Sequence, residues 1–166
     1  MRGPFNCVCL CIVAPSGHGK TAFMAVLANA ISCSQQSRSQ DSHQFGDSES
    51  LLRVRPVITR FCGISPGSSS GFNLLSSICL QLHLVLSHDR HELSAFNPDE
   101  LSYDALVSHF HRLLQENAVV LLIDSLDQLS DDNLARSHLS FLKGLKPHRD
   151  TRIIVSTLPD DPAPGL

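Results

Sequence analysis

The chain has 166 residues and a formal net charge of −3 at pH 7, with 42% hydrophobic and 17% charged residues. This length predicts one domain with a single core, and the composition is that of a globular protein rather than a disordered or membrane-embedded one. The small negative charge gives no reason to expect nucleic acid as a partner. No apolar run is long enough to span a membrane, so we expect no membrane partner either.

The six cysteines and nine histidines do not have the spacing of a metal site. No C-x-x-C pair is present, so we expect reduced thiols and a cytoplasmic location. Cys7, Cys9 and Cys11 alternate along an apolar run, which predicts that they lie on one face of a strand and are buried as small hydrophobic residues.

The first informative stretch, residues 14–21, reads APSGHGKT and lies between two apolar runs. Residues 7–13 predict a strand, and residues 21–31 predict a helix that is apolar nearly all round and therefore packed under a sheet between other helices. A strand, a glycine-bearing turn and a helix are the context that a phosphate-binding loop requires. The predicted nucleotide-binding residues are Ala14, Pro15, Ser16, Gly17, His18, Gly19, Lys20 and Thr21.

Each part of this motif has a chemical reason. Gly17 and Gly19 allow the backbone to curl so that successive N–H groups face one phosphate. Lys20 brings an ammonium group to the β- and γ-phosphates, and the Thr21 hydroxyl is placed to bind Mg²⁺. Ala14 stands where the motif usually has its first glycine, and its small side chain still permits the turn. The alternative is a Gly-Lys-Thr sequence that occurs in a turn by chance.

Residues 32–50 contain mostly Ser, Gln, Asp, His and Gly, which predicts a surface insertion or linker. Residues 53–64 carry β-branched and aromatic residues and predict a strand, with Pro56 near its start. The Ser- and Gly-rich residues 65–71 then predict a loop.

Two helices are predicted next. Apolar residues recur at helical spacing over residues 72–86 and again over residues 103–114. Between them, the polar residues 87–99 end in an Asn-Pro break, and Ser102 is a suitable N-cap for the second helix.

The second informative stretch is an unbroken apolar run, residues 118–123, followed by Asp124. Such a run predicts a parallel strand buried on both faces, and ligands bind beyond the carboxyl ends of such strands. Asp124 is therefore predicted to hold Mg²⁺ opposite Thr21, and its alternative role is a cap for the next turn. Asp127, three residues further on, is predicted to orient or deprotonate the attacking water; the alternative is an ordinary loop aspartate.

The last part of the chain predicts a helix over residues 130–145 and a strand over residues 151–158. Ser156 and Thr157, at the carboxyl end of this strand, are candidate sensors of a γ-phosphate. Residues 160–166, rich in Pro and Asp, predict a tail.

Strands that alternate with helices predict an α/β fold, a three-layer sandwich in which helices cover both faces of a mostly parallel sheet of about four strands. We expect residues 1–166 to form one P-loop NTPase core.

The motifs at residues 14–21 and 124–127 together resemble those of the NACHT class of signalling P-loop NTPases, the STAND group. A small residue after the metal-binding Asp, and a further acid two positions later, are characteristic of that class. Residues 60–69, 122–130 and 154–159 resemble in particular the NACHT and WD-repeat-domain family. The match covers nearly the whole chain.

The resemblance implies a P-loop fold in which the strand ending at Thr157 lies between the phosphate-loop strand and the strand ending at Asp124. It implies an ATP- or GTP-dependent switch whose nucleotide state controls assembly, with protein partners or self-association. Gln128 stands where the class usually has a second acid, and Leu158 where many members have an Arg, which together predict slow hydrolysis. The lid, winged-helix and WD-repeat regions of the class are absent, so we expect a fragment or a shortened member.

The sequence therefore predicts Mg²⁺-dependent binding and slow hydrolysis of ATP or GTP. One alternative is a non-catalytic nucleotide-binding interaction module, which Gln128 and Leu158 favour. Another is a P-loop small-molecule kinase, which is disfavoured because no Arg cluster follows Asp124.

Overall fold

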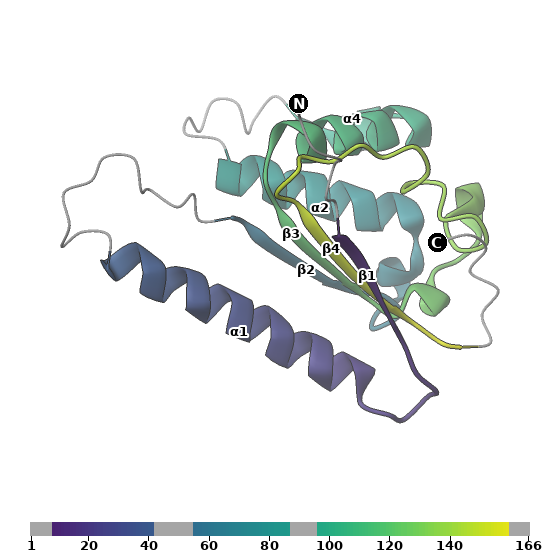
Figure 1. The fold of residues 1–166 in the computed structure, drawn as a ribbon. Helices are drawn as coiled ribbons and strands as arrows, with labels where there is room; N and C mark the ends of the chain where they lie inside the picture. Colours follow the sequence, from purple (N-terminus) through teal and green to yellow (C-terminus); the bar gives the residue numbers. More distant parts are fainter. Residues whose placement is uncertain (1–7, 42–54, 87–95, 160–166) are drawn as a thin grey trace, which may run out of the picture.

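The computed structural model describes residues 8–41, 55–86 and 96–159, and Figure 1 shows its ribbon. Four strands form one parallel sheet in the order β1-β4-β3-β2. They are β1 (Val8–Val13), β2 (Val57–Phe61), β3 (Val120–Asp124) and β4 (Arg152–Thr157). The parallel α/β fold is thus confirmed, and β4 lies between β1 and β3 as the resemblance implied.

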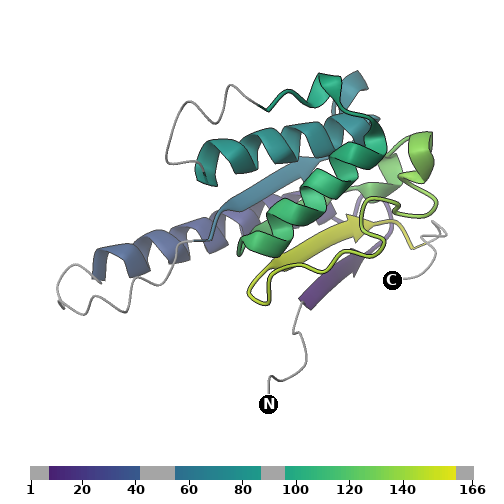
Figure 2. The ribbon, with the colours of Figure 1, turned by 90° about the horizontal axis from the view of Figure 1, so that it is seen from above.

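Helices cover both faces of the sheet, which gives the predicted three layers (Figures 1 and 2). One face carries α1 (Lys20–Asp41), and the other carries α2 (Gly71–Leu86) and α4 (Tyr103–Glu116). Short 3-10 turns lie in the connections: η1 (Pro66–Ser69), η2 (Pro98–Glu100), η3 (Leu126–Gln128) and η4 (Asp132–Leu134).

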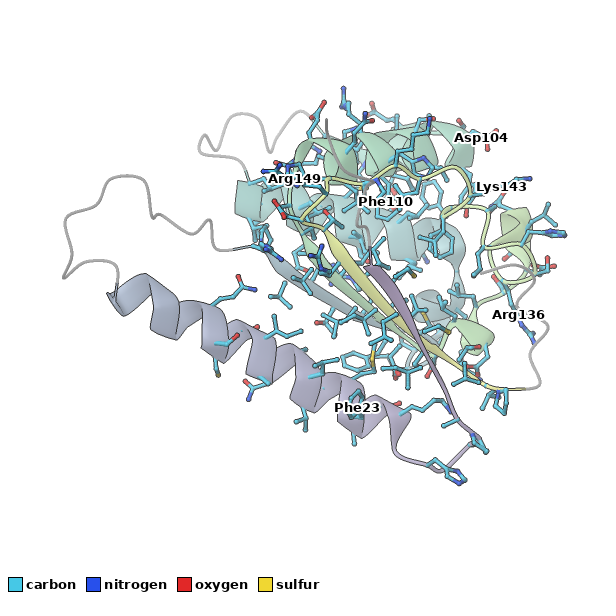
Figure 3. All side chains as sticks on the ribbon, in the orientation of Figure 1. Phe23, Asp104, Phe110, Arg136, Lys143 and Arg149 are labelled. Atoms are coloured by element: carbon cyan, nitrogen blue, oxygen red, sulfur yellow. The ribbon has the colours of Figure 1, made fainter. Side chains whose placement is uncertain are left out.

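The core is divided by the sheet, because successive side chains of a strand point to opposite faces. All five residues of β3 are buried, as its unbroken apolar run predicted. Leu121 and Ile123 pack in the larger cluster under α2 and α4, whereas Val120 and Leu122 pack with Met24 of α1. Figure 3 shows Phe110, which is fully buried, on the face covered by α2 and α4.

The first helix differs from its prediction in two ways. It continues to Asp41, so residues 32–41 are helical rather than a surface loop, while residues 42–50 and the predicted tail at 160–166 lie outside the described residues. Serine hydroxyls can bond to carbonyls of their own helix. Those of Ser32 and Ser34 donate to the carbonyls of Ala28 and Ile31 at 2.9 and 2.8 Å, which accommodates these polar residues in the helix.

The helix α1 is also not covered on all sides. Met24 is fully buried, but Phe23 and Val26 are 53% and 68% exposed. Within the described residues, α1 packs on the sheet and has no helix beside it (Figure 1). The prediction that other helices flank this helix is therefore wrong for the described residues, because part of its apolar surface is exposed.

The predicted helix over residues 130–145 is wrong. The chain makes only η4 and a series of turns there, and Asn133, Leu134 and Leu139 have φ values of 58°, 57° and 43°. A right-handed helix does not admit these values. Polar side chains bond to the backbone instead: the Asp131 carboxylate accepts from the Ser137 amide at 2.8 Å, and the Ser140 hydroxyl donates to the Asn133 carbonyl at 2.8 Å.

The expected burial of the strand cysteines is also wrong for Cys9, which is exposed, and Cys11 is half-buried. The reason is that β1 is an edge strand of this sheet. Cys7 lies outside the described residues. Across the part of the chain that the structure describes, no helix combines the length and apolar character that a membrane crossing needs.

The second predicted helix has the N-cap that the sequence indicates. The Ser102 hydroxyl accepts from the Ala105 amide at 3.3 Å, at the start of α4. We expect Ser102→Ala to lower the free energy of unfolding by about 1 kcal/mol, because a helix N–H loses its acceptor. Ser108→Ala, on the same helix and exposed, is the control and should be neutral or slightly stabilising. Urea denaturation of both variants measures the difference, and equal stability of the two would contradict a capping role.

Candidate functional site

The phosphate loop joins β1 to α1 and has the backbone form that its glycines allow. Gly17 and Gly19 have φ values of +79° and +78°, which residues with a side chain rarely adopt. A Cβ at either position would meet no atom within 4 Å, so backbone conformation rather than space requires glycine here. Ala14 does not have a positive φ, which explains why alanine is tolerated at the first position of the motif.

The first turn of α1 presents an electropositive end to this loop. The helix begins at Lys20, and its first turn contains no acidic residue. The positive end of the helix dipole is therefore not compensated by a side chain from that turn, which favours an anion. The Lys20 ammonium group donates to the carbonyls of Ala14 and Pro15, the latter at 3.1 Å, and so lies against the loop itself.

Asp124, at the carboxyl end of β3, is 1% exposed and accepts hydrogen bonds from three hydroxyl groups. Thr21 donates to Oδ2 at 2.6 Å, Ser125 donates to the same oxygen at 3.2 Å, and Ser156 donates to Oδ1 at 2.5 Å. Burial of an unpaired carboxylate is costly, and these donors offset the cost. Two predicted site residues that are 103 positions apart in sequence, Thr21 and Asp124, are thus in direct contact.

Asp127 lies in η3, the turn that follows β3. The turn starts at Ser125, whose φ of +59° lies in the left-handed region. Asp127 is 9% exposed, and its Oδ2 accepts from the Gln128 side-chain amide at 2.6 Å. Within the described residues, the buried Oδ1 has no hydrogen-bond partner. One oxygen of this carboxylate is therefore held by Gln128, and the other is buried without a hydrogen-bond partner in the described residues.

The two candidate sensors have different surroundings. The Ser156 hydroxyl is buried; it donates to Asp124 and accepts from the backbone amide of Ser125 at 2.9 Å. The Thr157 hydroxyl is also buried, but no partner for it is present in the described part of the chain. Of the two hydroxyls, only that of Thr157 lacks a hydrogen-bond partner in the described residues.

The phosphate loop and the segments that follow β2, β3 and β4 border a cleft of about 810 Å³ at the carboxyl edge of the sheet, whereas the buried residues Asp124, Ser156 and Thr157 do not line it. Its wall includes residues 16–21 of the phosphate loop, Ser125, Asp127 and Gln128 after β3, and Leu158 after β4. Sequence reasoning missed Ala22 and Ala25 of α1 and two apolar residues, Phe61 at the end of β2 and Ile64 in the loop after it. The positions of Phe61 and Ile64 could have been predicted from the sequence, because they follow a predicted strand and the carboxyl ends of parallel strands lie along the same edge of a sheet.

Cys62 lies beside the two carboxylates but has no nucleophilic character. Burial, and then the negative charges of Asp124 and Asp127, raise the pKa of its thiol to about 12. The thiol is therefore protonated at neutral pH, and only the thiolate is a good nucleophile. The carboxylates and hydroxyls remain as the reactive groups beside the phosphate loop.

The oxygen atoms at this site fit a Mg²⁺ ion. Mg²⁺ prefers oxygen ligands, keeps several waters and is usually held by one or two protein groups together with phosphates. The Thr21 hydroxyl and Asp124 Oδ2 are 2.6 Å apart and lie next to the phosphate loop. The candidate site thus consists of one hydroxyl and one carboxylate; in the described residues, this site included, no group of three or more His, Cys, Asp or Glu side chains is arranged to bind a metal ion.

A family model described as an AAA domain matches residues 2–160 of the chain. The match includes the phosphate loop, all four strands and the two aspartates. Comparison with curated proteins and with solved structures gave no match.

The contacts of Ser156 and Thr157 lead to opposite expectations for stability. Ser156→Ala leaves a buried carboxylate oxygen without its short donor and should lower the free energy of unfolding by about 1–3 kcal/mol. Thr157→Val is the matched control, because it removes a hydroxyl that has no hydrogen-bond partner among the described residues, and it should be neutral or stabilising. Thermal and urea denaturation without nucleotide distinguish the two variants. A larger loss in Thr157→Val than in Ser156→Ala would contradict these contacts.

Proposed function

This chain belongs to the AAA domain family of P-loop NTPases, and on that premise we propose that it binds Mg²⁺ with ATP or GTP in the phosphate-loop cleft and hydrolyses the nucleotide slowly. The nucleotide state would then act as a signalling or assembly switch. Membership of the family implies nucleotide binding; the metal dependence, the hydrolysis and the switch are our proposals.

The observation that carries the proposal is the contact of Thr21 with Asp124 at 2.6 Å beside the phosphate loop. It joins the start of α1 to the end of β3, so the hydroxyl and carboxylate expected to hold Mg²⁺ are brought together by the fold. The Lys20 contacts support the same reading, because its partners are neutral carbonyls that a phosphate oxygen would replace with a stronger, charge-assisted interaction.

In this proposal each residue has one task. Backbone amides of residues 16–21 and the Lys20 ammonium group bind the phosphates, and Thr21 and Asp124 hold the metal. When bound, Mg²⁺ would neutralise charge on the β- and γ-phosphates. Asp127, whose Oδ1 has no hydrogen-bond partner in the described residues, orients the attacking water and accepts its proton. Thr157 contacts the γ-phosphate, while Ser156 holds Asp124 in place.

We also propose that the chain is a NACHT-type member of the STAND group. The small residue Ser125 after the metal-binding Asp124 supports this, since it adopts a φ of +59° that turns the chain towards Asp127. Protein partners or self-association would read the nucleotide state, as in that class.

A non-catalytic nucleotide-binding module is the second candidate, and two observations favour it. The cleft has the amide of Gln128 in place of a second carboxylate, and apolar Leu158 on its wall. A small-molecule kinase has less support, since no arginine is among the described residues that line the cleft.

Nucleotide affinity tests the site itself. We expect Lys20→Ala to weaken triphosphate binding by about 2–5 kcal/mol, because the phosphates lose a charge-assisted contact. Calorimetry with ATP and with GTP, in Mg²⁺ and in EDTA, measures this loss and the metal dependence together. Lys143→Ala is the charge-matched control, since Lys143 is exposed and lies away from α1 (Figure 3). Unchanged affinity in folded Lys20→Ala protein would refute the site assignment.

Hydrolysis tests the role of Asp127. Asp127→Asn keeps the size of the side chain but removes the charge that accepts a proton. We expect single-turnover hydrolysis to fall roughly 10²–10⁴-fold while nucleotide affinity is retained. Wild-type turnover should itself be slow, ~10⁻³ s⁻¹ or below, as in unassisted GTPases. Equal rates in both proteins would make Asp127 an ordinary loop residue, and tight binding without hydrolysis in the wild type would favour the non-catalytic module.

A further inference from the structure

Gln128 is in direct contact with the carboxylate expected to activate water. Its side-chain amide nitrogen Nε2 donates to Asp127 Oδ2 at 2.6 Å, and both residues line the cleft. Its backbone amide donates to the Ser125 carbonyl at 2.9 Å, which closes the turn η3. The position of this side chain relative to Asp127 is therefore set by the turn as well as by the hydrogen bond.

The loop after β2 leaves space for the Gln128 side chain. Gly63 has a φ of +75°, and a Cβ built on it would lie 2.6 Å from Gln128 Cβ and 3.0 Å from Cγ. Contacts this short do not occur, so glycine at position 63 is needed for the glutamine to lie where it does. The two loops are also joined by their backbones, because the Cys62 amide donates to the Asp124 carbonyl at 3.0 Å.

The amide at position 128 supplies Asp127 with a hydrogen-bond donor, which an ionised acid could not do. An ionised carboxylate there would have no proton to donate and would repel Asp127, whereas the Gln128 amide donates a hydrogen bond to it. The bond occupies Oδ2 only, and the buried Oδ1 has no other partner in the described residues. The geometry thus distinguishes the two oxygens of Asp127.

We propose that Gln128, seated on Gly63, is a positioning residue that fixes the Asp127 carboxylate through Oδ2, so that this carboxylate is oriented to accept the proton of the attacking water. The inference rests on the proposed hydrolysis. In that step the water oxygen bonds to the γ-phosphorus while the bond from phosphorus to the β–γ bridging oxygen breaks. The bridging oxygen keeps the electron pair in the nucleoside diphosphate, and the water proton passes to the Asp127 carboxylate and then to the released phosphate.

A double-mutant cycle separates this role from simple packing. Gln128→Met keeps the Cβ and Cγ that lie over Gly63 but removes the donor. We expect single-turnover hydrolysis to fall about tenfold with nucleotide affinity retained, since a misplaced catalytic group costs rate rather than binding. In an Asp127→Asn background the same change should have no further effect, because contacting residues that act as a unit are not additive. Gln115→Met, on the exposed face of α4, is the control and should behave as wild type.

The nuclear magnetic resonance signal of the Gln128 side-chain amide tests the contact without catalysis. A hydrogen bond to a carboxylate should move one amide proton downfield, and Asp127→Asn should reverse this shift. An unshifted signal, an unchanged rate in Gln128→Met, or an equal loss in both backgrounds would overturn the positioning role. A wild type that binds nucleotide but does not hydrolyse it would overturn it too, even with the shifted signal present. Loss of nucleotide binding in the wild type would instead refute the proposed function, and the amide signal alone would then report whether the contact exists.

Discussion

The buried carboxylate of Asp124 is the constraint on which the rest of the site depends. A charge at 1% exposure is stable only with donors around it, and here they come from three segments: Thr21 at the start of α1, Ser125 after β3 and Ser156 in β4. The strand order makes this possible, because β4 lies beside β3 and brings Ser156 next to Asp124. A different order would leave the carboxylate short of a donor.

The same edge of the sheet carries a second, separate arrangement. The loop after β2 and the turn η3 after β3 are joined by the bond from the Cys62 amide to the Asp124 carbonyl. Gly63 gives space to Gln128, and Gln128 in turn contacts Asp127. In the proposed mechanism, metal binding would depend on β4 and water activation on the β2 loop. Ser125 contacts both arrangements, since its hydroxyl donates to Asp124 and its carbonyl accepts from the Gln128 amide.

The two sides of the sheet are unequal in their packing, which bears on the switch that we propose. The face under α2 and α4 contains the larger buried cluster, whereas α1 buries Met24 but exposes Phe23 and Val26 (Figures 1 and 3). The phosphate loop leads directly into α1, so a nucleotide bound as we propose would contact the less tightly packed layer. Fewer buried contacts lower the cost of a local displacement.

The sequence by itself determined the layered parallel fold, the phosphate loop and the pairing of Thr21 with Asp124. These follow from local causes: an apolar run of strand length, glycines with positive φ, and a carboxylate at a strand end. It did not determine the length of α1, the turns over residues 130–145 or the exposure of Cys9. Those depend on side chains that bond to nearby backbone groups and on β1 being an edge strand. The contact of Ser156 with Asp124 was likewise decided by tertiary structure alone, since it joins two packed strands. Gln128 bonds to its sequence neighbour Asp127, but its place against Gly63 comes from the packing of two loops, which no spacing in the chain specifies.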